Sequence, residues 1–194
     1  GGSMSVGTSS TSSAVNSVFS EGTFRQTAGT TTVGNSLIVA DKRFATGGVE
    51  ILSGTVSVGT DVTLASGLDT DGTLIVGGGT LDVTGDVTLG RSAGDSTGQL
   101  TQNNGDFSLN AITIHAGSRY DLTGGTLAIA DRFDLTGTLD FGGGDASITI
   151  ADSAVVDGST GKIPGLASHT NYTAGLNSES YFPAGFNPFT KFNS

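Results

Sequence analysis

Two stretches decide the fold, GGVEILSGTVSVGTDVTLA at residues 47–65 and DGTLIVGGGTLDVTGDVTLG at residues 71–90, because they read almost alike. In both, a short apolar segment precedes a glycine and Thr, then two apolar residues alternate with a polar one, and a turn leads to Val-Thr-Leu. Alternation with a period of two is typical of strands that bury one face. Each stretch therefore predicts three short strands separated by small turns.

The same pattern recurs along the chain when the glycine before the middle strand is taken as reference. That glycine is Gly29, Gly54, Gly79, Gly105, Gly125 and Gly144, at spacings of 25, 25, 26, 20 and 19 residues. The apolar positions two and four residues later are Thr31/Val33, Val56/Val58, Leu81/Val83, Phe107/Leu109, Leu127/Ile129 and Ala146/Ile148. Those five and three residues earlier are Phe24/Gln26, Val49/Ile51, Leu74/Val76, Leu100/Gln102, Tyr120/Leu122 and Leu139/Phe141. Those of the strand that follows are Leu37/Val39, Val62/Leu64, Val87/Leu89, Ile112/Ile114, Phe133/Leu135 and, more loosely, Ala154/Val156.

Three strands within 19–26 residues leave no room for helices. We therefore predict an all-β, single-chain parallel β-helix (β-solenoid) of about six three-strand coils, right-handed by the general preference of parallel crossovers. Equivalent residues stack into ladders, and six coils span about 25–30 Å. Insertions fall at one corner, at Asp41–Thr46, Ser66–Thr70 and Arg91–Thr97. The alternative, an antiparallel sandwich or barrel, needs Asn-Gly or Asp-Gly hairpin turns, which are rare here, and does not align three ladders.

The repeats divide the chain into three parts. Residues 1–20 form a Ser/Thr-rich N-terminal segment or cap, residues 21–158 the solenoid, and residues 159–194 a tail with all three prolines. End coils of a solenoid expose apolar interior and unpaired strand edges, so they must be covered. The aromatic tail either caps its own chain or docks on a neighbour. Its candidate assembly residues are Tyr181, Phe182, Phe186, Phe189 and Phe192.

Composition excludes several function classes. Glycine is frequent at 32 residues, and a net charge of −10 disfavours binding to nucleic acid or to anionic membranes. No apolar run reaches the ~18–20 residues of a transmembrane helix. Cysteine is absent, which excludes disulfides and Cys-based metal sites.

The quoted stretches, together with GQLTQNNGDFSLNAITI at residues 98–114, resemble the repeats of autotransporter passenger domains and of PEP-CTERM-type exported surface proteins of Gram-negative bacteria. The resemblance covers about residues 22–137 and concerns a repeat pattern. It implies secretion, a parallel β-helix, and a role in adhesion, biofilm matrix or surface filaments. It defines no functional residues.

Sites for chemistry are sparse. Asp61, Asp86 and Asp131 are expected to stack approximately, with Ala111 interrupting them, and such a row either binds calcium or is solvated at a turn. Clustered carboxylates and the long loops of an active-site cleft are missing, so we expect no enzyme and no required cofactor. His115 and His169 have no second ligand nearby for zinc.

Two sets of polar side chains remain. Gln26 and Gln102 stand at inward positions and are expected to bond to turn backbone. Outward threonines after the reference glycines suggest an ice-binding face, but their partner ladder is irregular and partly charged, so ordinary exposed-strand composition explains them.

The sequence thus predicts a secreted or cell-surface structural protein whose partners are copies of itself, associating end to end into filaments. An adhesive or carbohydrate-binding module, with extracellular polysaccharide as partner, is the alternative. An ice-binding protein and a polysaccharide-active enzyme are less favoured.

Overall fold

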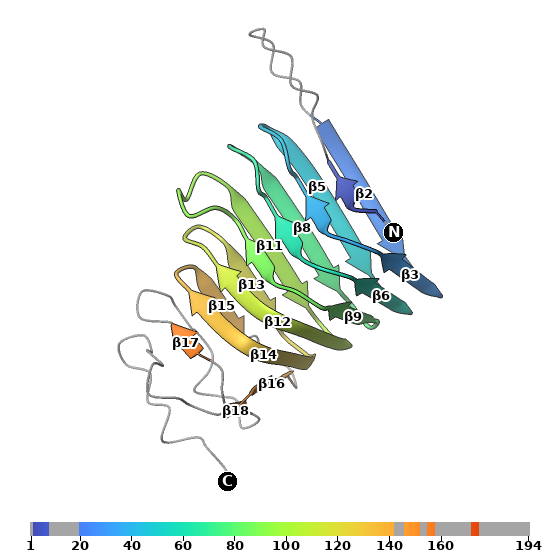
Figure 1. The fold of residues 1–194 in the computed structure, drawn as a ribbon, viewed down its shortest axis with the longest axis vertical. Coiled ribbons are helices and arrows are strands. Elements are labelled where there is room, and N and C mark those ends of the chain that lie inside the picture. The colour runs from blue at the N-terminus through green and yellow to red at the C-terminus, as the bar shows by residue number, and fades with distance from the viewer. Residues whose placement is uncertain (1, 8–19, 142–145, 152–154, 158–171, 175–194) are drawn as a thin grey trace, which may run out of the picture.

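The structure is a computed structural model that describes residues 2–7, 20–141, 146–151, 155–157 and 172–174. Every regular element in these residues is a β-strand, and every strand pairing is parallel. The strands stack into a β-solenoid of about five turns (Figure 1). Among the described residues there is no helix that could cross a membrane. The predicted fold class, an all-β parallel β-solenoid, is confirmed.

Each coil contributes its first strand to a six-stranded sheet. In stacking order these strands are β2 (Ser20–Gln26), β5 (Ala45–Ile51), β8 (Asp71–Val76), β11 (Thr97–Gln102), β13 (Arg119–Leu122) and β15 (Thr138–Phe141). The predicted ladders of this sheet are confirmed residue by residue. For example, Phe24 pairs with Val49 and Val49 with Leu74, and the ladder continues to Leu139.

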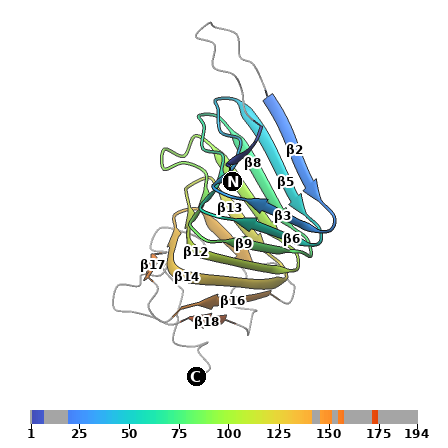
Figure 2. The same ribbon diagram turned by 45° about the vertical axis from the view of Figure 1, so that its right-hand side comes forward.

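The second and third strands of each coil form a twelve-stranded sheet that wraps around the corner (Figure 2). The second strands are β3 (Thr30–Val33), β6 (Thr55–Val58), β9 (Thr80–Val83), β16 (Ala146–Ile150) and β18 (Tyr172–Ala174). The third strands are β1 (Met4–Val6), β4 (Leu37–Val39), β7 (Val62–Leu64), β10 (Val87–Leu89) and β17 (Val155–Asp157). β12 (Asp106–Ile114) and β14 (Gly125–Leu135) run through both positions.

The core lies between the two sheets and consists of the stacked apolar ladders. Leu37, Val62, Val87 and Ile112 form one ladder and are essentially unexposed. Burying each such side chain stabilises the fold by about 1.5–3 kcal/mol relative to leaving it in water. Because most pairings join neighbouring coils, stability accumulates from one coil to the next.

Glycines are required where one corner of the coil packs backbone against backbone. Gly47 lies against the third strand, and a Cβ there would come within 2.6 Å of Val6 O and 2.9 Å of Ala40 N. Its ladder partners are also glycines, Gly22 on one side and Gly72 on the other. At the opposite corner the reference Gly54 has a φ of 80°, and its Cβ would lie 2.2 Å from Gly29 O.

The loops of variable length lie at the corner predicted from the sequence. They connect third strands to first strands, at residues 40–44, 65–70 and 90–96, and shorten to residues 115–118 and 136–137 in the later coils. Four non-glycine residues at this corner adopt a positive φ. They are Ala40, Phe44, Ala65 and Asp69.

The register predicted for the sixth coil is wrong by two residues. Ile148 pairs with Leu127 and Ile150 with Ile129, whereas the sequence alignment put Ala146 and Ile148 at these positions. A shift of two residues leaves the same side chains facing inward, so the alternating pattern fits both registers. The structure takes the register that fills the ladder with the larger Ile150, which is 2% exposed. Val156 likewise pairs with Phe133, not with Leu135.

The structure also shows a strand that the sequence analysis does not predict. β1 pairs in register with β4, so that Met4 lies beside Leu37 and Val6 beside Val39. Gly7 follows with a φ of 69°, just as Ala40 and Ala65 follow the next third strands. The segment MSVG therefore repeats the LIVA and VTLA endings of the coils that follow it.

Candidate functional site at the solenoid ends

The five aromatic residues predicted to mediate assembly, Tyr181, Phe182, Phe186, Phe189 and Phe192, lie outside the described residues. The same holds for His169 and for the rest of the predicted tail, residues 159–194, except β18 (Tyr172–Ala174). The ends of the stack itself are described, and they carry the features relevant to association.

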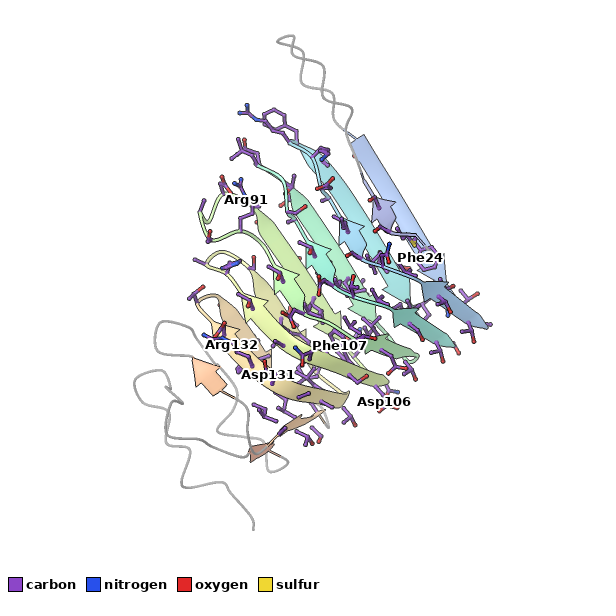
Figure 3. The ribbon with its side chains drawn as sticks, in the orientation of Figure 1. Phe24, Arg91, Asp106, Phe107, Asp131 and Arg132 are labelled. Carbon is purple, nitrogen blue, oxygen red and sulfur yellow. The ribbon has the colours of Figure 1, made fainter. Side chains whose placement is uncertain are left out.

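The N-terminal end of the stack presents three strands that are paired on one side only in the described residues, since β1 pairs with β4 alone. β2 is the terminal strand of its sheet, and β3 pairs with β6 alone. Phe24, on β2, is only partly buried although it belongs to a core ladder (Figure 3). Thr31 stands at the corresponding core position of β3 and is also half-buried.

The hydrogen-bonding groups of β3 show which atoms face the open side. The N–H of Thr55 donates to Gly29 O at 2.9 Å, and the N–H of Gly59 donates to Val33 O at 2.8 Å. In a parallel strand, successive residues direct their N–H and C=O groups alternately to the two neighbours. Thr30 and Thr32 therefore direct theirs away from β6. An edge of this kind is a template for another strand.

The C-terminal end is also open within the described residues. β15 is the terminal strand of the first sheet. β17 pairs only with β14, and β18 pairs only with β16. Both ends thus display the cross-section of the same stack of parallel strands.

Two buried glutamines bind the turn backbone, as predicted. Nε2 of Gln102 donates to Gly105 O and to Thr126 O, both at 3.0 Å. Nε2 of Gln26 makes the equivalent bonds, to Gly29 O at 3.1 Å and Thr55 O at 2.9 Å.

The two amides differ in the hydrogen bonding of their side-chain oxygens. Oε1 of Gln102 accepts a hydrogen bond from the hydroxyl of Tyr120, whereas Oε1 of Gln26 is buried without a partner in the described residues. The position equivalent to Tyr120 in the coil after Gln26 is occupied by Val49, which has no donor. Burial raises the pKa of the Tyr120 phenol well above its usual value.

The aspartate row is only partly as predicted. Asp61 and Asp86 stack, and Oδ1 of Asp61 accepts the N–H of Asp86 at 2.9 Å. Oδ1 of Asp86 accepts from Nδ2 of Asn110 at 2.9 Å. Asp131 is not in this row, because a β-bulge opposite Asn110 inserts one extra residue into β14 and brings Arg132 to the position beside Ala111 (Figure 3).

The carboxylates of this row thus serve as hydrogen-bond acceptors between coils. No group of three or more His, Asp or Glu side chains in the described parts of the chain could hold a metal ion.

Charged residues elsewhere pair across neighbouring coils on the exposed faces. Arg25 lies 3.1 Å from Glu50, and Arg119 bonds to both Asp121 and Asp140. The pKa of the Arg119 guanidinium is raised, mainly by its hydrogen bond to Asp121. Exposed pairs of this kind contribute at most about 1 kcal/mol each. Partial burial lowers the pKa of His115, and the charge of Asp134 opposes this shift.

The outward threonine ladder forms in register up to Thr126, but Asp106 interrupts it. In the adjacent ladder Oγ of Ser108 donates to Oδ1 of Asp82 at 2.7 Å. This face is therefore a mixed polar surface rather than a regular array of hydroxyls and methyls.

No protein-family model, curated protein or solved structure matches this chain.

Proposed function

We propose that this protein is a non-catalytic structural β-solenoid of the bacterial cell surface or extracellular matrix, which associates end to end into filaments. The observation that carries the proposal is that, within the part of the chain that the structure describes, strand edges at both ends of one parallel stack are paired on one side only, at β2 and β3 and at β15 and β18. Association of such ends pairs their backbone groups and buries the half-exposed core ladders.

Three features support this function. The strands β3 and β18 contain neither proline nor a charged residue, the features by which edges are commonly blocked. The exposed faces between the ends carry many neutral polar residues, and some of their charges pair between coils, as at Arg25 and Glu50. The resemblance of the repeats to exported bacterial surface proteins supports the extracellular location.

A proline on the open edge tests the proposal. Because Thr32 directs its N–H away from β6, Thr32→Pro removes a donor that the chain's own ladder does not use. We expect the wild-type protein to form fibres in negative-stain electron microscopy and Thr32→Pro to remain as short rods. Thr32→Ala is the matched control, since it alters the same side chain but keeps the N–H and is expected to retain fibres.

The unfolding temperature separates a blocked edge from a damaged fold. It should be nearly the same for Thr32→Pro and Thr32→Ala. Short, monodisperse rods of the wild-type protein at all concentrations would contradict the function. Deletion of residues 180–194 then tests the aromatic tail separately, because loss of fibres in that variant alone assigns assembly to the tail.

A further inference from the structure

The two ends of the solenoid differ in which strand extends furthest. At the N-terminal end, the third strand of the coil extends one position beyond the others, because β1 lies on β4 while β2 and β3 have no strand beyond them in the described residues. At the C-terminal end, the second strand extends one position further, because β18 lies on β16. The third strand there ends at β17 and the first at β15.

We propose that copies of this chain stack head to tail in one fixed register, in which β18 of one copy pairs with β3 of the next while β17 pairs with β1. This inference rests on the proposed function and specifies its interface. β18 supplies the second strand of a coil and β1 of the neighbouring copy supplies the third strand of that same coil. The junction is thus a coil shared between two molecules.

A single displacement along the rod satisfies both pairings. Placing β1 of the second copy one strand spacing beyond β17 also brings its β3 one spacing beyond β18, since each end is longer by one strand at a different position. A displacement shorter by one coil would put two strands in one place. A displacement longer by one coil would leave both positions empty. All pairings in the stack are parallel, so the direction of the chain is preserved across the junction.

The same displacement leaves one strand position between β15 of the first copy and β2 of the second, whose separation is then about 10 Å.

An interface between two different ends does not close on itself. Each added copy presents the same free end as the last, so this contact generates an open filament in place of a dimer. The repeat distance of the filament is seven strand spacings, about 33–34 Å.

Disulfide trapping tests the register, because the chain contains no cysteine. Thr173 pairs with Thr149, whose ladder begins at Thr32, so the register puts Thr173 of one copy beside Thr32 of the next. Asp157 pairs with Asp134, whose ladder begins at Ser5. Neighbouring strands lie about 4.7–4.9 Å apart, within the Cα separation of disulfides.

We expect Thr32→Cys/Thr173→Cys and Ser5→Cys/Asp157→Cys to give covalent multimers of increasing size on non-reducing gels after mild oxidation. The mismatched pair Ser5→Cys/Thr173→Cys and each single variant should give no species larger than a dimer. Thr32→Cys/Ser57→Cys is the positive control, since these residues are neighbours within one chain and should form an intramolecular disulfide.

The outcomes separate the register from the function. This register is wrong if fibres form but neither matched pair gives covalent multimers, or if the mismatched pair gives multimers in equal yield. Either result would still be consistent with end-to-end association. Absence of both fibres and multimers overturns the register and the proposed function together.

Discussion

The hydroxyl of Tyr120 donates a hydrogen bond to Oε1 of Gln102, and both side chains are fully buried in neighbouring coils. Nε2 of the same amide donates to the carbonyl of Gly105 in the following turn and to that of Thr126 on β14, so the side chain of Gln102 links the first strand, its following turn and the next coil. Gln26 makes the equivalent two bonds at the first coil but has no third partner among the described residues.

Removing the Tyr120 hydroxyl should give Gln102 the same unpaired oxygen that Gln26 has. We expect Tyr120→Phe to lower the free energy of unfolding by about 1–3 kcal/mol, the cost of leaving a buried acceptor without a donor. Urea unfolding followed by circular dichroism measures this loss. An unchanged midpoint would show that water replaces the hydroxyl.

The two glutamines provide a matched comparison. Gln26→Leu and Gln102→Leu each remove two bonds to turn carbonyls, but Gln102→Leu also leaves the Tyr120 hydroxyl buried without an acceptor. We therefore expect Gln102→Leu to cost about 1–2 kcal/mol more than Gln26→Leu in urea unfolding. Adding Tyr120→Phe to Gln102→Leu should recover part of this difference. Equal costs for the two single variants would contradict the network.

The buried phenol also predicts a dependence of stability on alkaline pH. Burial raises the pKa of Tyr120 in the folded state, so below pH ~10 both the folded and the unfolded chain hold this proton. Above pH ~10 the unfolded chain releases it first, and stability falls by about 1.4 kcal/mol for each pH unit. The stability difference between the wild type and Tyr120→Phe should therefore shrink by about 1.4 kcal/mol between pH 9 and pH 11. A constant difference over this range would contradict the prediction.

Alanine substitutions at two adjacent glycines of β5, Gly47 and Gly48, should have different effects on stability. In Gly47→Ala the new Cβ meets Val6 O at 2.6 Å and Ala40 N at 2.9 Å, and both are backbone atoms. We expect a loss of more than about 2 kcal/mol, as for an overpacked core. In Gly48→Ala the nearest atom is Oγ1 of Thr23 at 3.9 Å, so the change should be neutral or stabilising by up to about 1 kcal/mol. Thermal unfolding of the two variants side by side provides the measurement.

The corrected register of the sixth coil can be checked by a disulfide within one chain. Thr126 pairs with Ser147, whereas the alignment by Gly144 would place it beside Asp145. Thr126→Cys/Ser147→Cys is expected to oxidise readily to an intramolecular disulfide. Thr126→Cys/Asp145→Cys is the control and should oxidise more slowly. Faster oxidation of Thr126→Cys/Asp145→Cys than of Thr126→Cys/Ser147→Cys would support the register predicted from the glycines.

The ladders of the first five coils could be predicted because two independent signals agree in them. A glycine fixes the origin of each repeat, and large apolar residues such as Leu74 and Leu100 recur at fixed distances from it. In the sixth coil the two signals separate, since Gly144 and the pair Ile148 and Ile150 indicate registers two residues apart. The alternation of apolar and polar residues fits both registers. The packing of the core side chains decides between them.

Other features could not be predicted from the sequence because they depend on contacts between coils. The bulge that displaces Asp131 is visible only when β12 and β14 are paired. The glycine ladder through Gly47 and Gly72 has no local signature, because its cause is the backbone of the third strand packing against it. β1 did have a signal, since MSVG ends like LIVA and VTLA, but three residues without a first or second strand do not complete a repeat.

The parallel ladders have a mechanical consequence. Every hydrogen bond between coils lies along the axis of the rod, so tension applied along that axis loads the coils in series. The force at which such a rod yields is then set by its weakest layer, and strengthening any other layer leaves it unchanged. The layer linked by the buried amide and phenol of Gln102 and Tyr120 should resist this tension longest, and extension under load should begin at layers without such a link.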